Sequence, residues 1–262
     1  MTSRHLFFKA MREDLRHKVW MIALSVLANF LLLPVAWLVQ KNNMRVLTHS
    51  ELYDSKFYWV RIMNYLQEYL PVAGGFIAIA GALIVVLFGF RYVFHKKMID
   101  TYHSIPIQRS TLYGVCWLNG VLIWLIPFLL GYTVTFAMIF SYAGNMFDSD
   151  WTPAVLFQMA FVSLLVVAVA FFLVYHLVLT AVMISGNVLN TLVSMMIMGF
   201  GAISIYALVI NFFSFYMSTF YSGNIPVEPG FYLSPFMSAI YLLYLRAQNE
   251  YSGLMGLELP AY

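Results

Sequence analysis

Five long apolar runs are the feature that most limits what this chain can fold into. An α-helix needs roughly 20 residues to cross a bilayer, and each run is long enough. Only 10% of the residues are charged and the mean hydropathy is +0.81, whereas a soluble domain carries about 25% charged residues. The sequence therefore predicts an all-α, polytopic membrane bundle. Its predicted spans are residues 19–39, 71–94, 112–140, 153–184 and 188–215.

The first 18 residues form a polar, amphipathic segment. Phe7, Met11, Leu15 and Val19 recur at steps of four, and basic residues cover the remaining surface. This spacing predicts a helix with one apolar stripe, and a helix of that kind lies in the membrane interface. The alternative is an N-terminal extension of the first span. No cleaved targeting segment is expected, since the apolar run that follows is too long for a signal peptide.

Local features refine the predicted spans. Pro34 lies inside the first span and is expected to kink it, because proline removes a backbone donor and clashes with the preceding turn. Residues 41–70 are expected to connect the first two spans and to include a helix that lies at the membrane interface. The residues spaced for this helix are Tyr53, Phe57, Tyr58, Trp59, Ile62 and Leu66. The motif Ser185-Gly186-Asn187 predicts a tight hairpin between the fourth and fifth spans.

Small residues in two spans predict close helix contacts. In lipid, small side chains let two helices approach, and van der Waals contact then holds them together. Gly74 and Ala78 in the second span, and Gly199 and Gly201 in the fifth, are candidates for contact with a second membrane subunit. Packing within the chain is the alternative for this stripe.

The distribution of Lys and Arg predicts the orientation. Nine lie in the N-terminal segment and around the loop that follows the second span, against five on the other side. The excess of positive charge favours a cytoplasmic N-terminus. With five spans, residues 216–262 are then an extracellular segment.

Residues that carry chemistry are scarce. There is no GxxxxGK[ST], HExxH, GxSxG or CxxC motif. Apart from Arg91 near the end of the second, the predicted spans contain no Asp, Glu, Lys or Arg. Cys116 and His176 are expected to be packing residues, and the pair His95 and His103 makes a poor metal site. Five amides are expected to form interhelical hydrogen bonds: Asn29, Asn119, Gln158, Asn190 and Asn211. We expect no catalytic, metal or cofactor site in this chain and no nucleic-acid partner.

The loop between the second and third spans, HKKMIDTYHSIPIQRSTL (95–112), is unusually polar for this chain. Its charges require contact with water. Met98–His103 can form a short helix, and Pro106 disfavours helix at the residue before it. Such a helix held between two spans would transmit force from a soluble partner. A solvated loop that only fixes topology is the alternative.

Within this loop, Asp100, Tyr102, Ser104, Ile105, Pro106, Ile107 and Arg109, followed by Leu112 and Tyr113, form one motif. It resembles the D-x-Y-x-S-L-P-I-x-R signature of bacterial ABC-2 type transporter permeases, especially those of Gram-positive bacteria. Ile105 stands where that signature has Leu. The resemblance implies that residues 95–111 are a cytoplasmic coupling loop whose short coupling helix docks on a separate ATPase subunit, which binds ATP and Mg. The residues it implies for this contact are Lys97, Asp100, Tyr102, Ser104, Pro106, Ile107 and Arg109.

The resemblance also implies an assembly in the cell membrane. Two permease subunits, identical or different, would pair with two ATPase subunits amid membrane lipids, and residues 1–18 would lie along the cytoplasmic interface. The family has six spans, so a sixth is expected beyond Tyr262; residues 231–245 would make a poor one.

The implied function is export of a peptide or lipid-like compound. The alternative is the membrane component of an antimicrobial-peptide sensing or immunity system. An intramembrane enzyme is disfavoured, because carboxylates and nucleophile motifs are missing from the spans.

Overall fold

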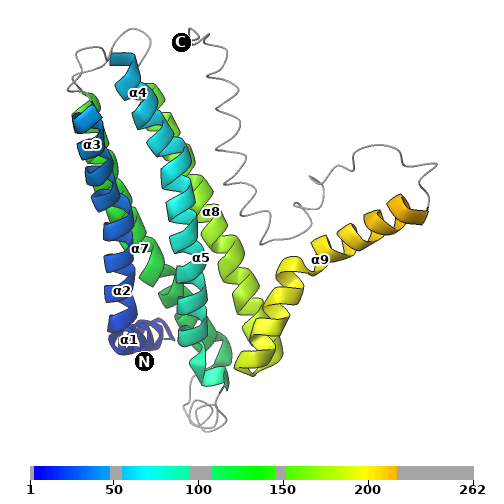
Figure 1. Ribbon diagram of the computed structural model, residues 1–262. Helices are drawn as coiled ribbons and strands as arrows, with labels where there is room; N and C mark the ends of the chain where they lie inside the picture. Colours follow the sequence, from blue (N-terminus) through cyan, green and yellow to red (C-terminus); the bar gives the residue numbers. More distant parts are fainter. Residues whose placement is uncertain (1–2, 48–54, 95–107, 145–151, 217–262) are drawn as a thin grey trace.

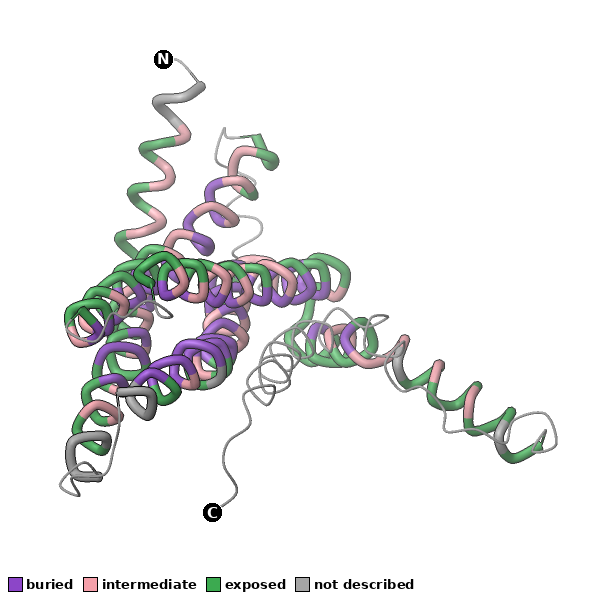
Figure 2. The backbone as a smooth tube through the Cα atoms, turned by 90° about the horizontal axis from the view of Figure 1, so that it is seen from above, coloured by how far each residue is buried: buried purple, intermediate pink, exposed green. Residues whose placement is uncertain are grey.

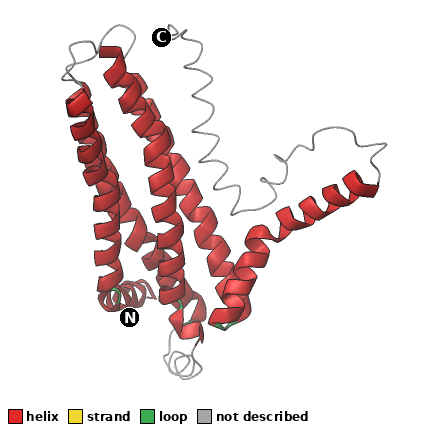
Figure 3. Ribbon diagram, in the orientation of Figure 1, coloured by secondary structure: helices red, strands yellow, loops and turns green. Residues whose placement is uncertain are grey.

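The computed structural model describes residues 3–47, 55–94, 108–144 and 152–216 (Figure 1). These residues form helices joined by short turns, with no strand among them (Figure 3). In chain order the helices are α1 (Ser3–His17), α2 (Val19–Phe30), η1 (Leu31–Val35), α3 (Ala36–Leu47), α4 (Ser55–Asn64), η2 (Tyr65–Tyr69), α5 (Leu70–Gly89), η3 (Arg91–Phe94), α7 (Arg109–Ala143), α8 (Pro153–Ser185) and α9 (Val188–Tyr216).

Among the described residues, five helices are long and apolar enough to cross a bilayer: Val19–Asn43, Trp59–Gly89, Arg109–Ala143, Pro153–Ser185 and Val188–Phe213. They confirm the predicted polytopic helical bundle. Successive long helices run in alternating directions (Figure 1). As a result α1, η3, the start of α7 and the turn between α8 and α9 all lie at one end of the molecule, called here the α1 end.

The N-terminal segment is a separate helix and not an extension of the first span. The backbone leaves helical geometry at Lys18, with φ −107° and ψ 15°, and α1 lies across the base of the bundle (Figure 1). Phe7, Met11 and Leu15 are partly buried. Val19 does not continue their stripe, contrary to the predicted spacing, because it follows the break and is exposed on α2.

The first long helix contains Pro34 in a π-helical turn, Leu31–Val35. A π turn is a common local response to an interrupted hydrogen-bond ladder, so the proline perturbs the helix without ending it. The hydroxyl of Tyr65 donates a hydrogen bond to the carbonyl of Leu33 over 3.0 Å. This bond ties the proline turn to the second long helix.

The second span begins earlier than predicted. α4, η2 and α5 follow one another without a break, and the membrane-length helix starts at Trp59 instead of residue 71. Trp59, Ile62 and Leu66 are buried in the bundle, so the predicted interfacial helix within residues 41–70 is wrong for them.

Polar residues within this stretch do not end the helix. The buried amide of Gln67 donates to the sulfur of Met159 over 3.2 Å, which satisfies it inside the bundle. Arg61 and Glu68 therefore fall within a membrane-length helix. The expectation that the spans contain no charged residue apart from Arg91 is wrong here.

The core is built on stacked aromatic rings. The indole of Trp124 lies parallel to the ring of Phe171, with centroids 3.9 Å apart, and stacks on Phe128 at 4.7 Å. Gly81 of α5 makes room for this indole, because a Cβ there would overlap it. Seen along the bundle in Figure 2, buried positions line the faces that the helices turn toward one another. Cys116 is among these buried residues, as predicted.

The predicted hairpin between the last two spans is confirmed. Gly186 has φ +60°, a left-handed conformation that glycine adopts without strain. Beyond the turn, α9 leans away from the bundle (Figure 1). Only 6% of its most apolar 18-residue stretch is buried, against 50% in α8.

Candidate functional site

The predicted coupling segment is described only at its edges. Lys97, Asp100, Tyr102, Ser104, Pro106 and Ile107 lie outside the described residues. Arg109 is the first residue of α7 and is exposed. The chain enters this segment from η3 and leaves it into α7, both at the α1 end.

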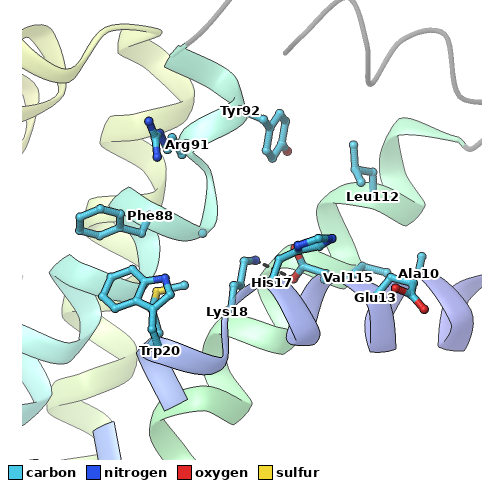
Figure 4. Close-up of a pocket in the computed structure, with 13 residues that line it drawn as sticks. Ala10, Glu13, His17, Lys18, Trp20, Phe88, Arg91, Tyr92, Leu112 and Val115 are labelled. Atoms are coloured by element: carbon cyan, nitrogen blue, oxygen red, sulfur yellow. Dashed lines mark hydrogen bonds and ion pairs between the residues drawn. The ribbon is translucent and has the colours of Figure 1, made fainter. Parts of the chain in front are cut away.

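A cavity of about 630 Å³ lies at this end, between α1, the end of α5 and the start of α7 (Figure 4). Arg91 and Tyr92 lie on one side of it, and His17 and Lys18 on the other. We call it the basal cavity; its lining residues are Ala10, Glu13, Asp14, His17, Lys18, Trp20, Met21, Phe88, Gly89, Arg91, Tyr92, Leu112 and Val115.

A buried ion pair forms one wall of the basal cavity. The ammonium of Lys18 lies 2.6 Å from Oδ2 of Asp14, and the two side chains are 9% and 19% exposed. The amide of Asn119, from α7, donates to the same carboxylate oxygen over 2.7 Å and to the carbonyl of Met11 over 3.1 Å. α1, the start of α2 and α7 therefore share one polar cluster, called here the basal cluster.

The surroundings of this pair make it costly to disrupt. Burial strips water from both charges, and such a pair is stable only when further hydrogen bonds satisfy it. Asn119 supplies that bond from another helix. By contrast, the neighbouring pair on α1, Arg16 and Glu13, is 67% and 52% exposed with its charged atoms 3.4 Å apart, so water screens their attraction.

Sequence reasoning missed the basal cluster. It placed Lys18 on the exposed basic face of the N-terminal helix. Asp14 and Lys18 are four residues apart, a spacing that predicts an ion pair on a helix, but the spacing gives no sign of burial. Neither the helix break at Lys18 nor the contact of Asp14 with Asn119 of α7 follows from that spacing.

Of the five amides predicted to form interhelical hydrogen bonds, Asn119 forms them, from α7 to α1. Asn29 and Asn211 instead donate to carbonyls one turn back on their own helices, Ser25 and Ala207. Gln158 and Asn190 are exposed on α8 and α9.

His176 packs against another helix, as predicted, but it is not buried: its ring lies 6.1 Å from that of Trp117 on α7, centroid to centroid. Its ring is exposed on α8, and Nδ1 lies 2.7 Å from the carbonyl of Phe172. A carbonyl can only accept, so Nδ1 carries the proton of this bond. Nδ1 is thus satisfied although the ring is exposed.

Two of the small residues proposed for a subunit contact are buried within the chain. A Cβ at Gly74 would lie 3.0 Å from Cγ2 of Val167, and Ala78 is fully buried. The predicted close approach is present between α5 and α8. On α9, Gly199 is buried and Gly201 is partly exposed. A role for these four positions between subunits stays a prediction.

No group of three or more His, Cys, Asp or Glu side chains suited to a metal ion occurs in the part of the chain that the structure describes. Comparison of the chain with protein-family models, with curated proteins and with solved structures gives no match.

Proposed function

We propose that this chain is the membrane-spanning permease subunit of an ABC exporter in the cell membrane, with a cytoplasmic N-terminus. Its substrate would be a peptide or lipid-like compound. ATP, with Mg, would be hydrolysed on separate ATPase subunits, and a second permease subunit would complete the path. The observation that carries the proposal is the motif from Asp100 to Arg109, which joins two membrane-length helices at the end where α1 lies.

The geometry around the motif supports a mechanical role. Residues 95–108 connect directly to α7, a single helix that reaches Ala143. Asn119 lies about 15 Å along α7 from Arg109, at 1.5 Å per residue. Through the basal cluster, a displacement of the start of α7 would reach α1 and the first long helix.

Membrane topology gives the first test. Cys116 is the one cysteine in the sequence, so Cys116→Ala provides a cysteine-free background. In it, His103→Cys reports on the motif and Ser50→Cys on the opposite side of the membrane. A membrane-impermeant maleimide on intact cells should label residue 50 at once and residue 103 only after permeabilisation. Labelling of residue 103 in intact cells would reject the proposal.

Coupling gives the second test. Replacing both Tyr102 and Arg109 with Ala should leave the chain in the membrane but abolish transport and its stimulation of ATP hydrolysis. The matched control replaces Tyr53 and Arg45, which belong to the connection predicted on the opposite side. Unchanged stimulation in the first pair would exclude the proposed role of the motif.

A further inference from the structure

An apolar groove lies next to the basal cavity, farther along the bundle. A second cavity, of about 280 Å³, lies between α2 and α5, and Met21 lines both. Among the side chains of the groove are Leu24, Ala28, Phe76 and Ala80. Charged side chains line part of the basal cavity, whereas Ser25 is the one hydroxyl-bearing residue among the apolar side chains that line the groove. This is the distribution of polarity along an amphiphile.

Two aromatic rings mark where the polar and apolar parts meet. Trp20 and Phe88 line the basal cavity and contact each other edge to face, with centroids 5.1 Å apart. Both are about half exposed, and an exposed Trp at the end of a membrane-length helix is typical of the depth of lipid headgroups. The basal cavity thus opens at headgroup depth, and the groove runs toward the acyl chains.

The charges of the basal cavity favour an anion. Each of its two carboxylates has a basic partner within four residues, Lys18 for Asp14 and Arg16 for Glu13. Arg91 is exposed on the opposite side, without an ion pair to any described residue. A guanidinium in this position suits a phosphate group, which it binds through paired hydrogen bonds.

We propose that this space binds one anionic phospholipid of the surrounding leaflet. The phosphate would contact Arg91, with His17 across the cavity, and one acyl chain would lie between α2 and α5 in contact with Ala28 and Ala80. The lipid would join α1, α2 and α5 at the end of the bundle where the predicted coupling segment begins. This assignment depends on the chain spanning a membrane and is independent of the exporter function.

Native mass spectrometry of the full-length chain tests the site. The purified protein is exchanged into detergent with equal amounts of phosphatidylglycerol and phosphatidylcholine. We expect one phosphatidylglycerol to be retained in preference to phosphatidylcholine. Arg91→Gln should lower this retention on the order of tenfold, the effect of losing one charge-assisted contact. Ala28→Phe should lower retention of both lipids, because its ring occupies the groove.

Matched substitutions separate the site from general effects. Arg12→Gln removes the same charge from the exposed face of α1, and Ala23→Phe adds the same ring to an exposed position of α2; neither residue lines the two cavities. Both should retain lipid as the unmodified chain does. If Arg91→Gln and Arg12→Gln retained phosphatidylglycerol equally well, the proposal would be overturned. Equal retention of phosphatidylglycerol and phosphatidylcholine by the unmodified chain would also overturn it. Arg91 is exposed, so its variant decides the matter even if Ala28→Phe does not fold.

Discussion

Removing the carboxylate of the basal cluster should destabilise the protein far more than removing an exposed carboxylate one residue away. In Asp14→Leu, the ammonium of Lys18 keeps its charge at a position where the side chain is 9% exposed. Asn119 loses one of its two acceptors and keeps the carbonyl of Met11. The variant thus leaves an uncompensated buried cation.

Breaking a buried pair in this way costs about 3–5 kcal/mol. Because Lys18 borders the basal cavity and its flexible stem can carry the ammonium toward water, we expect the lower part of that range. Lys18→Met should cost about 1–2 kcal/mol, since the Asp14 carboxylate keeps its bond from Asn119. The double variant should lie within about 1 kcal/mol of the unmodified chain, because apolar replacement of a whole buried pair is often nearly neutral.

Thermal unfolding in detergent, followed by tryptophan fluorescence, measures the four members of this cycle. For a chain of this size about 1 kcal/mol corresponds to roughly 2–4 °C, so Asp14→Leu should lower the midpoint by about 6–12 °C. Glu13→Leu and Arg16→Met form the control cycle on the same helix, where the exposed pair should show a coupling below about 1 kcal/mol. Equal midpoints for Asp14→Leu and Glu13→Leu would refute the assignment of a buried ion pair.

Three further substitutions test the packing, each by the unfolding midpoint. Gly120→Ala should cost about 1–3 kcal/mol, because its Cβ would overlap the hydroxyl of Tyr175; if Tyr175→Phe does not restore part of this loss, the clash is not the cause. Trp59→Ala should cost about 3–5 kcal/mol and Val60→Ala, at an exposed position, less than about 1 kcal/mol; similar losses would place residue 59 at an interface, as first predicted. Gly186→Ala should cost about 1–2 kcal/mol, and no loss would argue against the left-handed turn.

The sequence predicts the number of long helices because each apolar run is long enough to identify a span by itself. The fourth and fifth helices begin and end within a residue or two of their predicted limits, since Pro153 and Gly186 mark a helix start and a helix end. The start of the second span was predicted poorly. Its first turns contain Arg61 and Gln67, which resemble an interface sequence until tertiary contacts such as the bond from Gln67 to Met159 are known.

The basal cluster depends on information that periodicity does not contain. A helical spacing tells which residues share a face, but it does not tell which helix that face meets. The backbone turns at Lys18, and the ion-pair partner of its buried side chain, Asp14, is bound by Asn119 of α7. The stripe of Gly74 and Ala78 is similar: the small residues predicted a close contact, and only the fold identifies α8 as the helix in contact.

Isolation of the intact complex from its native membrane tests the central proposal most directly. The tagged full-length chain is purified in mild detergent and its partners are identified by mass spectrometry. The proposal predicts a co-purifying ATPase with a phosphate-binding GxxxxGK[ST] motif, in equal amount to this chain, and loss of that ATPase when Tyr102 and Arg109 are both replaced by Ala. A folded chain that purifies without an ATPase, or a double variant that retains it fully, would contradict the proposed function.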